Sequence, residues 1–146
     1  MPPRFVFRYK EQLVTNPRTG AQETYHSPLL PCVLEWRGKR SPQTEGLLDS
    51  GSDGVVLPLG VARYLDLDLR PVEAPMQVVG TAVPQYVARV DLTIGRAGRF
   101  HTFADLEVSV PREGETPIII GRRPVFEVYR VTFVEPELKF VLDPYK

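Results

Sequence analysis

The chain has 146 residues, with 18 basic and 18 acidic side chains, so its formal net charge at pH 7 is zero. This length suits one domain with a single hydrophobic core, and an apolar fraction of 42% is ordinary for a globular protein. The charge balance argues against a general nucleic-acid-binding protein, which usually carries a basic excess. No nucleic-acid partner is therefore expected.

Cysteine and histidine are too scarce to build a disulfide or a metal cluster. Cys32 is the only cysteine, and His26 and His101 lie far apart in the sequence. The first ten residues, MPPRFVFRYK, lack the apolar stretch and cleavage site of a secretory signal. No apolar run approaches the roughly 20 residues that span a bilayer. We therefore expect a cytoplasmic protein with no metal and no membrane partner.

The first third of the chain predicts short β-strands separated by turns. Residues 4–14 alternate between apolar and polar side chains, as in a half-exposed strand, and the turn at 16–20 leads to a partner strand. Cys32 is expected to be a small buried residue of the next strand. The strands predicted here cover 4–14, 22–27, 30–36 and 44–50.

The rest of the chain continues this pattern with one or two short helices. Pro58 is expected to open a helix that ends near Leu65, because proline is tolerated in a first helical turn. Residues 116–121 form a continuous apolar run, typical of a strand buried on both faces. The other predicted elements are two strands over 74–95 with a tip near Gly80, a strand over 100–110, a helical turn over 121–129 and a hairpin over 130–144.

An acidic residue directly follows the apolar strand that contains Leu47 and Leu48. Asp49 begins the stretch Asp-Ser-Gly-Ser-Asp, and a carboxylate in apolar surroundings costs several kcal/mol unless it is paired, hydrogen-bonded or protonated. Taken alone, these residues favour an ordinary turn at the end of a strand. The alternative is a half-buried carboxylate held for chemistry.

Four features occur in a characteristic order: LLDSGSDGVVLP, a hairpin about thirty residues later, the strand IIIGRR, and a short helix. This order resembles the retroviral-type, or retropepsin-like, aspartic proteases and their cellular relatives. The resemblance covers residues 30–143, with residues 1–29 as an N-terminal hairpin extension of the same domain. It implies a mostly β acid-protease barrel with one or two short helices, in a two-fold symmetric dimer.

The resemblance implies that Asp49 is the catalytic residue of an aspartic endopeptidase. Two carboxyls sharing one proton can activate water and protonate the peptide carbonyl, because like charges so close cannot both ionise. The chain carries one Asp-Ser-Gly motif, so the second carboxyl is expected from Asp49 of a second copy in a homodimer. Ser50 is expected to hydrogen-bond across to the partner loop, and Gly51 to allow a tight turn. The substrate would be a peptide or protein, and no cofactor is needed.

Two further parts of the site follow from the same resemblance. Asp53 is expected to pair with Arg122, whose guanidinium can hold a carboxylate and fix the active loop. The hairpin containing Val78, Val79, Gly80, Thr81 and Ala82 is expected to act as a flap that closes over substrate and excludes water. This flap carries one glycine, whereas retroviral flap tips are glycine-rich.

Two other interpretations stay open at the level of sequence. A catalytically silent member could use the same scaffold as a peptide-binding or dimerisation module, since fold does not fix function. A monomeric all-β binding domain could instead carry Asp49 in a solvated turn. The termini also depart from the retroviral pattern, in which short chain ends build much of the dimer sheet.

Overall fold

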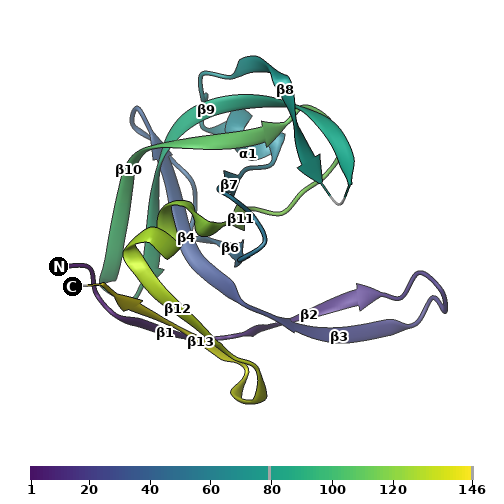
Figure 1. The fold of residues 1–146 in the computed structure, drawn as a ribbon, viewed down its shortest axis with the longest axis vertical. Helices are drawn as coiled ribbons and strands as arrows, with labels where there is room; N and C mark the ends of the chain where they lie inside the picture. The colour runs from purple at the N-terminus through teal and green to yellow at the C-terminus, as the bar shows by residue number, and fades with distance from the viewer. Residues whose placement is uncertain (79, 146) are drawn as a thin grey trace.

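The computed structural model describes residues 1–78 and 80–145 and consists mainly of β-strands (Figure 1). The expected helix after Pro58 is present as α1, and the expected helical turn before residue 129 is present as η1. In chain order the elements are β1 (Phe5–Arg8), β2 (Lys10–Thr15), β3 (Gln22–Ser27), β4 (Leu29–Trp36), β5 (Lys39–Arg40), β6 (Thr44–Leu48), β7 (Val55–Val56), α1 (Leu59–Tyr64), β8 (Arg70–Val78), β9 (Thr81–Arg96), β10 (Arg99–Pro111), β11 (Ile119–Ile120), η1 (Arg122–Phe126), β12 (Tyr129–Val134), η2 (Glu135–Glu137) and β13 (Lys139–Pro144).

Six strands close into a barrel. The pairing order runs β4, β6, β11, β7, β10, β9, and an additional pairing of β9 with β4 closes the ring. The short strand β11 lies between β6, to which it is parallel, and β7, to which it is antiparallel. The loop over residues 49–54 therefore connects two strands that are not neighbours in the sheet.

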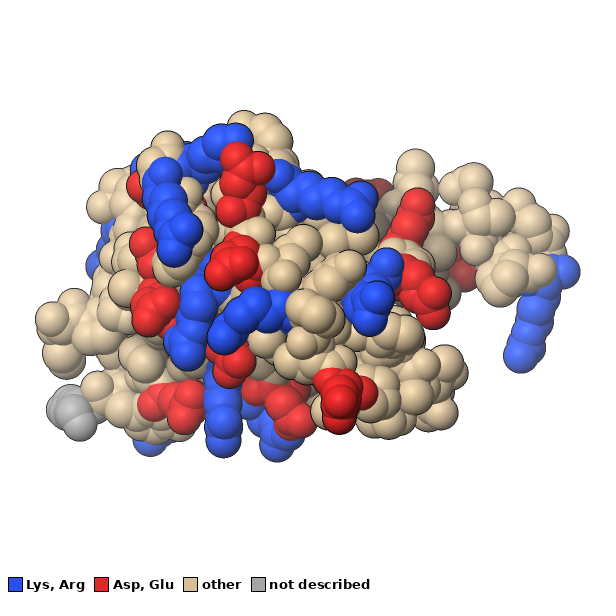
Figure 2. Space-filling model, turned by 90° about the horizontal axis from the view of Figure 1, so that it is seen from above, with Lys and Arg blue, Asp and Glu red and all other residues tan. Residues whose placement is uncertain are grey.

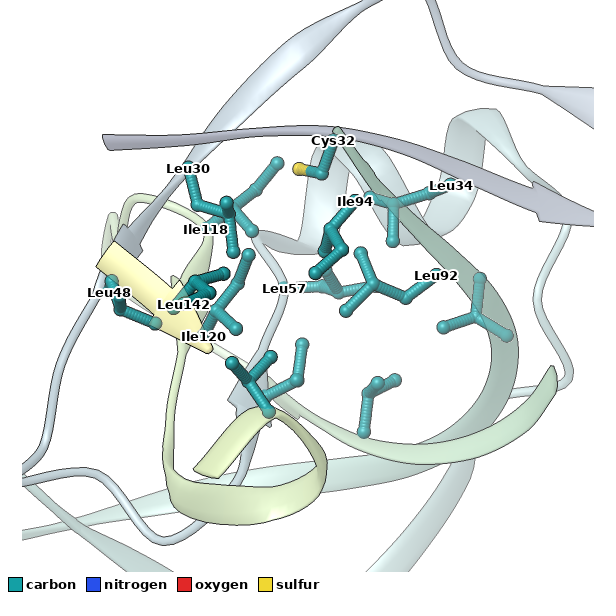
Figure 3. Packing of buried hydrophobic residues seen from close by; sticks show 14 of the residues in the cluster. Leu30, Cys32, Leu34, Leu48, Leu57, Leu92, Ile94, Ile118, Ile120 and Leu142 are labelled. Carbon is teal, nitrogen blue, oxygen red and sulfur yellow. The ribbon is translucent and has the colours of Figure 1, made fainter. Parts of the chain in front are cut away.

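Alternating apolar side chains fill the barrel (Figure 3). In β9 the inward residues are Ala88, Val90, Leu92 and Ile94, which are at most 1% exposed. The central strand β11 contributes Ile120, which is fully buried, but Ile119 is partly exposed, so the strand expected over 116–121 is shorter than predicted and is not buried on both faces. Cys32 lies in the same cluster, and burial raises the pKa of its thiol to about 12. A thiol that stays protonated is a poor nucleophile, so Cys32 is a packing residue.

The two ends of the chain pair with each other outside the barrel. β1 lies antiparallel to β13, which also pairs with β12, so the expected terminal hairpin becomes part of a three-stranded sheet. The single strand expected over 4–14 is in fact two strands with different partners. β1 buries Phe5 and Phe7 against the core, whereas every residue of β2 is exposed.

β2 and β3 form a hairpin, here called the arm (residues 10–27), that belongs to no larger sheet. Figure 1 shows the arm extending away from the barrel, and Figure 2 shows it as a projection from the body. The face seen in Figure 2 mixes acidic and basic side chains without a large area of one sign. Across the described residues, no helix is long and apolar enough to cross a membrane.

Candidate active site

Asp49 lies where β6 leaves the barrel core. Leu48, the last residue of β6, is 2% exposed, whereas Asp49 is half-buried and Ser50 is exposed. The Asp49 amide donates a hydrogen bond to the Ile120 carbonyl at 3.0 Å, so β11 positions the first residue of the loop. The acid thus stands at the boundary between core and solvent.

The loop itself orients the Asp49 carboxylate. Oδ1 accepts a hydrogen bond from the Gly51 amide at 2.8 Å, and the Asp49 carbonyl accepts one from the Ser52 amide at 3.2 Å. This is the pattern of an aspartate-capped turn, in which the side chain bonds the backbone two residues later. Both the turn interpretation and the catalytic one predict this local geometry. To distinguish the two interpretations, the contacts of the loop with the segment after β11 are more useful.

Three consecutive backbone amides after β11 clamp the loop. Gly121 donates to the Gly54 carbonyl at 3.0 Å, Arg122 to the Ser52 carbonyl at 2.8 Å, and Arg123 to the Asp53 carbonyl at 3.0 Å. These bonds form between segments almost seventy residues apart in sequence. Because they join backbone atoms, they do not depend on the Arg122 or Arg123 side chain.

Gly121 makes this close approach possible. A Cβ atom at this buried position would lie 2.4 Å from both the Ser52 and the Gly54 carbonyl oxygens. Such distances are essentially never tolerated, so the clamp requires glycine. No role was predicted for Gly121. Its place at the end of the apolar strand was the available signal, but the carbonyl oxygens that exclude a side chain come from a distant segment.

Asp53 and Arg122, which were expected to lie together, form an ion pair in which the Arg122 guanidinium Nη2 donates to Asp53 Oδ1. Their side chains are 91% and 57% exposed, respectively, so the pair stabilises the isolated chain little. Ser52 adds a bond that was not predicted, from its hydroxyl to the Gly54 carbonyl at 3.0 Å. Backbone contacts, more than this ion pair, hold the loop.

Gly51 lies in a turn, closed by the hydrogen bond from the Ser52 amide to the Asp49 carbonyl, but its own backbone conformation does not require glycine. Its φ does not lie in the left-handed region, and an added Cβ would meet only Asp49 Oδ1, at 3.2 Å. Gly51 and Ser50 are both exposed at the tip of the loop. The predicted contacts of these two residues with a second copy stay predictions.

The expected flap is a hairpin of β8 and β9, in which Val78 pairs with Thr81. Gly80 has φ +78°, a conformation that favours glycine, and Thr81 and Ala82 are exposed. Val79, also predicted for the flap, lies outside the described residues. In Figure 1 this hairpin extends beyond the barrel on the same side as the arm.

Within residues 1–78 and 80–145, no group of three or more His, Cys, Asp or Glu side chains could hold a metal ion. His101 packs edge-on against Phe103, with ring centroids 4.7 Å apart, and burial lowers its pKa. Asp49 and Asp53 are the two acids on the clamped loop, and Asp53 is paired with Arg122.

The chain is similar in structure to a retropepsin-like aspartic protease from Rickettsia conorii. The TM-score is 0.56, covering 96% of this chain and 92% of that chain, at 12% sequence identity. No family model matches the sequence, and no curated protein matches it. At this identity the likeness shows the fold alone, so the mostly β, retropepsin-like fold expected from the sequence is confirmed.

Proposed function

We propose that the chain is an aspartic endopeptidase that acts as a homodimer, with Asp49 of each copy forming the catalytic pair. The observation that carries this proposal is the position of Asp49 in a retropepsin-like fold, on a loop clamped by the segment after β11. A solvated turn would not need a buried glycine and three backbone hydrogen bonds from a distant segment to fix it.

The second carboxyl must come from another copy. In the described residues, the Asp49 carboxylate accepts one hydrogen bond, from the Gly51 amide, and no other acid bonds to it. The two acids nearest in sequence, Glu45 and Asp53, are paired with Lys10 and Arg122, respectively. A two-fold axis beside the loop would bring two Asp49 side chains together and supply the missing carboxyl.

The chemistry follows from two carboxyls that share one proton. The ionised carboxyl takes a proton from a bound water as the water attacks the peptide carbonyl, and the neutral carboxyl donates its proton to the carbonyl oxygen. Proton return to the leaving amine then breaks the peptide bond. The flap residues Val78, Val79, Gly80, Thr81 and Ala82 would close over the substrate and exclude bulk water.

The direct test is Asp49→Asn, which keeps the side-chain shape but removes the ionisable group. We expect hydrolysis of a diverse peptide library to fall by at least about a thousandfold, with the fold and dimer mass unchanged. Asp68→Asn, at an exposed position away from the loop, is the matched control and should keep full activity. Peptidase activity retained in Asp49→Asn would refute the assignment of the catalyst.

A mixing experiment tests the shared site. If subunits exchange, an equal mixture of wild-type and Asp49→Asn chains contains only about a quarter of dimers with two Asp49 residues, so activity per wild-type chain should fall by about half. A catalytic site complete within one chain would leave activity per wild-type chain unchanged. A strictly monomeric but active protein would also contradict the proposal.

A further inference from the structure

The base of the arm lies directly beside the candidate catalytic loop. Pro28, which follows the last residue of β3, accepts a hydrogen bond from the Leu48 amide at 3.0 Å. Leu29 then pairs with Leu47. The residue that follows β3 is therefore bonded to Leu48, the residue directly before Asp49. A second copy that brings its own Asp49 to this loop must also lie near the arm.

The other strand of the arm is anchored at Tyr9, between β1 and β2. Its side chain is 7% exposed, its hydroxyl donates to Glu135 at 2.6 Å, and its amide donates to the Leu138 carbonyl at 2.7 Å. Lys10, the first residue of β2, forms an ion pair with Glu45 of β6 at 2.6 Å. The arm is thus fixed at its base and aimed in one direction.

Beyond this base, the strands of the arm pair with no other strand among the described residues. At about 3.3 Å per residue, the six paired positions of β2 and β3 extend roughly 20 Å. A two-stranded hairpin of this kind is at best marginally stable in water, and its outer edges can accept further pairing. It nevertheless exposes 72% of Leu13, 44% of Val14 and 51% of Tyr25. These apolar side chains are open to contact with another molecule.

The strand register places these apolar side chains on both faces of the arm. Gln12 pairs with Tyr25, and Val14 lies two residues further along β2, so Val14 and Tyr25 share one face. Leu13 pairs with Thr24 and points to the other face. Contacts are therefore available on either side of the arm, as expected for an element that lies along a partner.

We propose that the arm of each subunit lies along the body of a second copy of this chain and is the principal contact that holds the dimer together. This inference rests on the proposed function, which requires a second Asp49 beside the first. Because a two-fold interface is reciprocal, each subunit gives one arm and receives the other. In Figure 1 the arm and the flap hairpin extend on the same side of the barrel, so the partner would lie on that side, between the two hairpins.

The test shortens the arm without touching the loop. Residues 12–25 are replaced by Asn-Gly, a two-residue turn that joins Glu11 to His26, which pair directly. A second variant, Leu13→Asp with Tyr25→Asp, keeps the arm but charges both faces. Phe100→Asp, at a similarly exposed position (47%) in β10, is the control.

Sedimentation and peptide cleavage are measured over a range of protein concentrations. We expect both arm variants to fold and to dimerise at least about a hundredfold more weakly than the wild type and the control. Their activity should be low in dilute solution and should recover as concentration rises, because Asp49 and its loop are intact. Recovery with concentration separates a lost dimer contact from a lost catalyst.

Two results would overturn the inference. If the wild type is dimeric and active, and both arm variants dimerise as tightly as it does, the arm is not the dimer contact and the proposed function stands. If the wild type is monomeric and inactive at every concentration, both the arm inference and the proposed function fail. Asp49→Asn, which should dimerise normally, shows whether the measured dimer depends on the catalytic group.

Discussion

The loop over residues 49–54 and the arm over residues 10–27 both reach the surface, but their own chain holds them in different ways. The loop receives three backbone hydrogen bonds from the segment after β11, across a glycine that admits no side chain. The arm is anchored at its base, and beyond it the two strands bond mainly to each other.

The loop is held by contacts within its own chain, whereas the arm is the part that we propose to be held by a partner. If Asp49 is the catalytic group, as we propose, its carboxylate must be held close to its productive geometry before substrate arrives, and the clamp would do this within one chain. The two strands of the arm pair with each other, and every residue of β2 is exposed to solvent. Three substitutions test whether the loop is held by the segment after β11 and whether the arm unfolds separately from the barrel.

The largest effect is expected for Gly121→Ala. The new methyl group would lie 2.4 Å from two backbone carbonyl oxygens, neither of which can rotate away, so the loop must separate from the segment after β11. We expect the free energy of unfolding, measured in urea, to fall by at least about 3 kcal/mol. Peptidase activity should be lost with it.

Gly60→Ala is the matched control for this substitution. Gly60 is exposed in α1, and nothing lies within 4 Å of a Cβ built on it. Because glycine in a helix is less favourable than alanine, this change should stabilise the chain by about 0.5–1 kcal/mol. If the free energy of unfolding of Gly121→Ala lies within about 1 kcal/mol of the wild-type value, the segment after β11 does not clamp the loop.

A smaller effect is expected at the base of the arm. Tyr9→Phe removes the hydrogen bond to Glu135 and should lower the free energy of unfolding by about 1 kcal/mol near pH 7. Tyr129→Phe is the control, because the Tyr129 hydroxyl is buried with no hydrogen-bond partner among the described residues. Removing that hydroxyl should be neutral or stabilising.

The same pair of tyrosines makes the stability sensitive to alkaline pH. Burial, together with Glu135, raises the pKa of Tyr9 to about 12, and burial raises the pKa of Tyr129 to about 12. Below pH 10 these hydroxyls keep their protons in both the folded and unfolded chains. Between pH 10 and 12 the unfolded chain loses its protons first, so stability falls. Each Phe variant should show a shallower fall in urea unfolding over this range; an unchanged slope would contradict the assignment.

The sequence was sufficient to predict local structure and the order of the motifs. Alternation predicted most of the strands, Pro58 marked the start of α1, and the apolar run 116–121 identified a central strand. The resemblance to the retropepsin-like proteases also implied the ion pair between Asp53 and Arg122, which are 69 residues apart. These features depend on short patterns or on a motif whose parts have a fixed order.

The parts that were not predicted depend on partners distant in sequence. The alternation of Phe5, Phe7 and Tyr9 stops at the polar residues 10–12, but nothing in the segment shows that β1 joins β13 while β2 stays exposed. The adjacent Leu13 and Val14 would have suited a buried strand equally well. The need for glycine at position 121 comes from carbonyl oxygens of the 49–54 loop, which the sequence alone could not place beside it.

The smallest effect is expected at the tip of the arm, and it tests directly whether the arm unfolds separately from the barrel. Gly20 has φ +71°, so alanine there costs about 1 kcal/mol of backbone strain, although nothing lies within 4 Å of the new methyl group. In the monomer this cost should weaken the turn alone, where the Asn16 amide bonds the Ala21 carbonyl at 2.8 Å. We expect the Asn16 amide to exchange with solvent roughly fivefold faster, while the free energy of global unfolding changes by less than about 0.3 kcal/mol. A global loss near 1 kcal/mol would mean instead that the arm unfolds together with the barrel, and the contrast with the loop would fail.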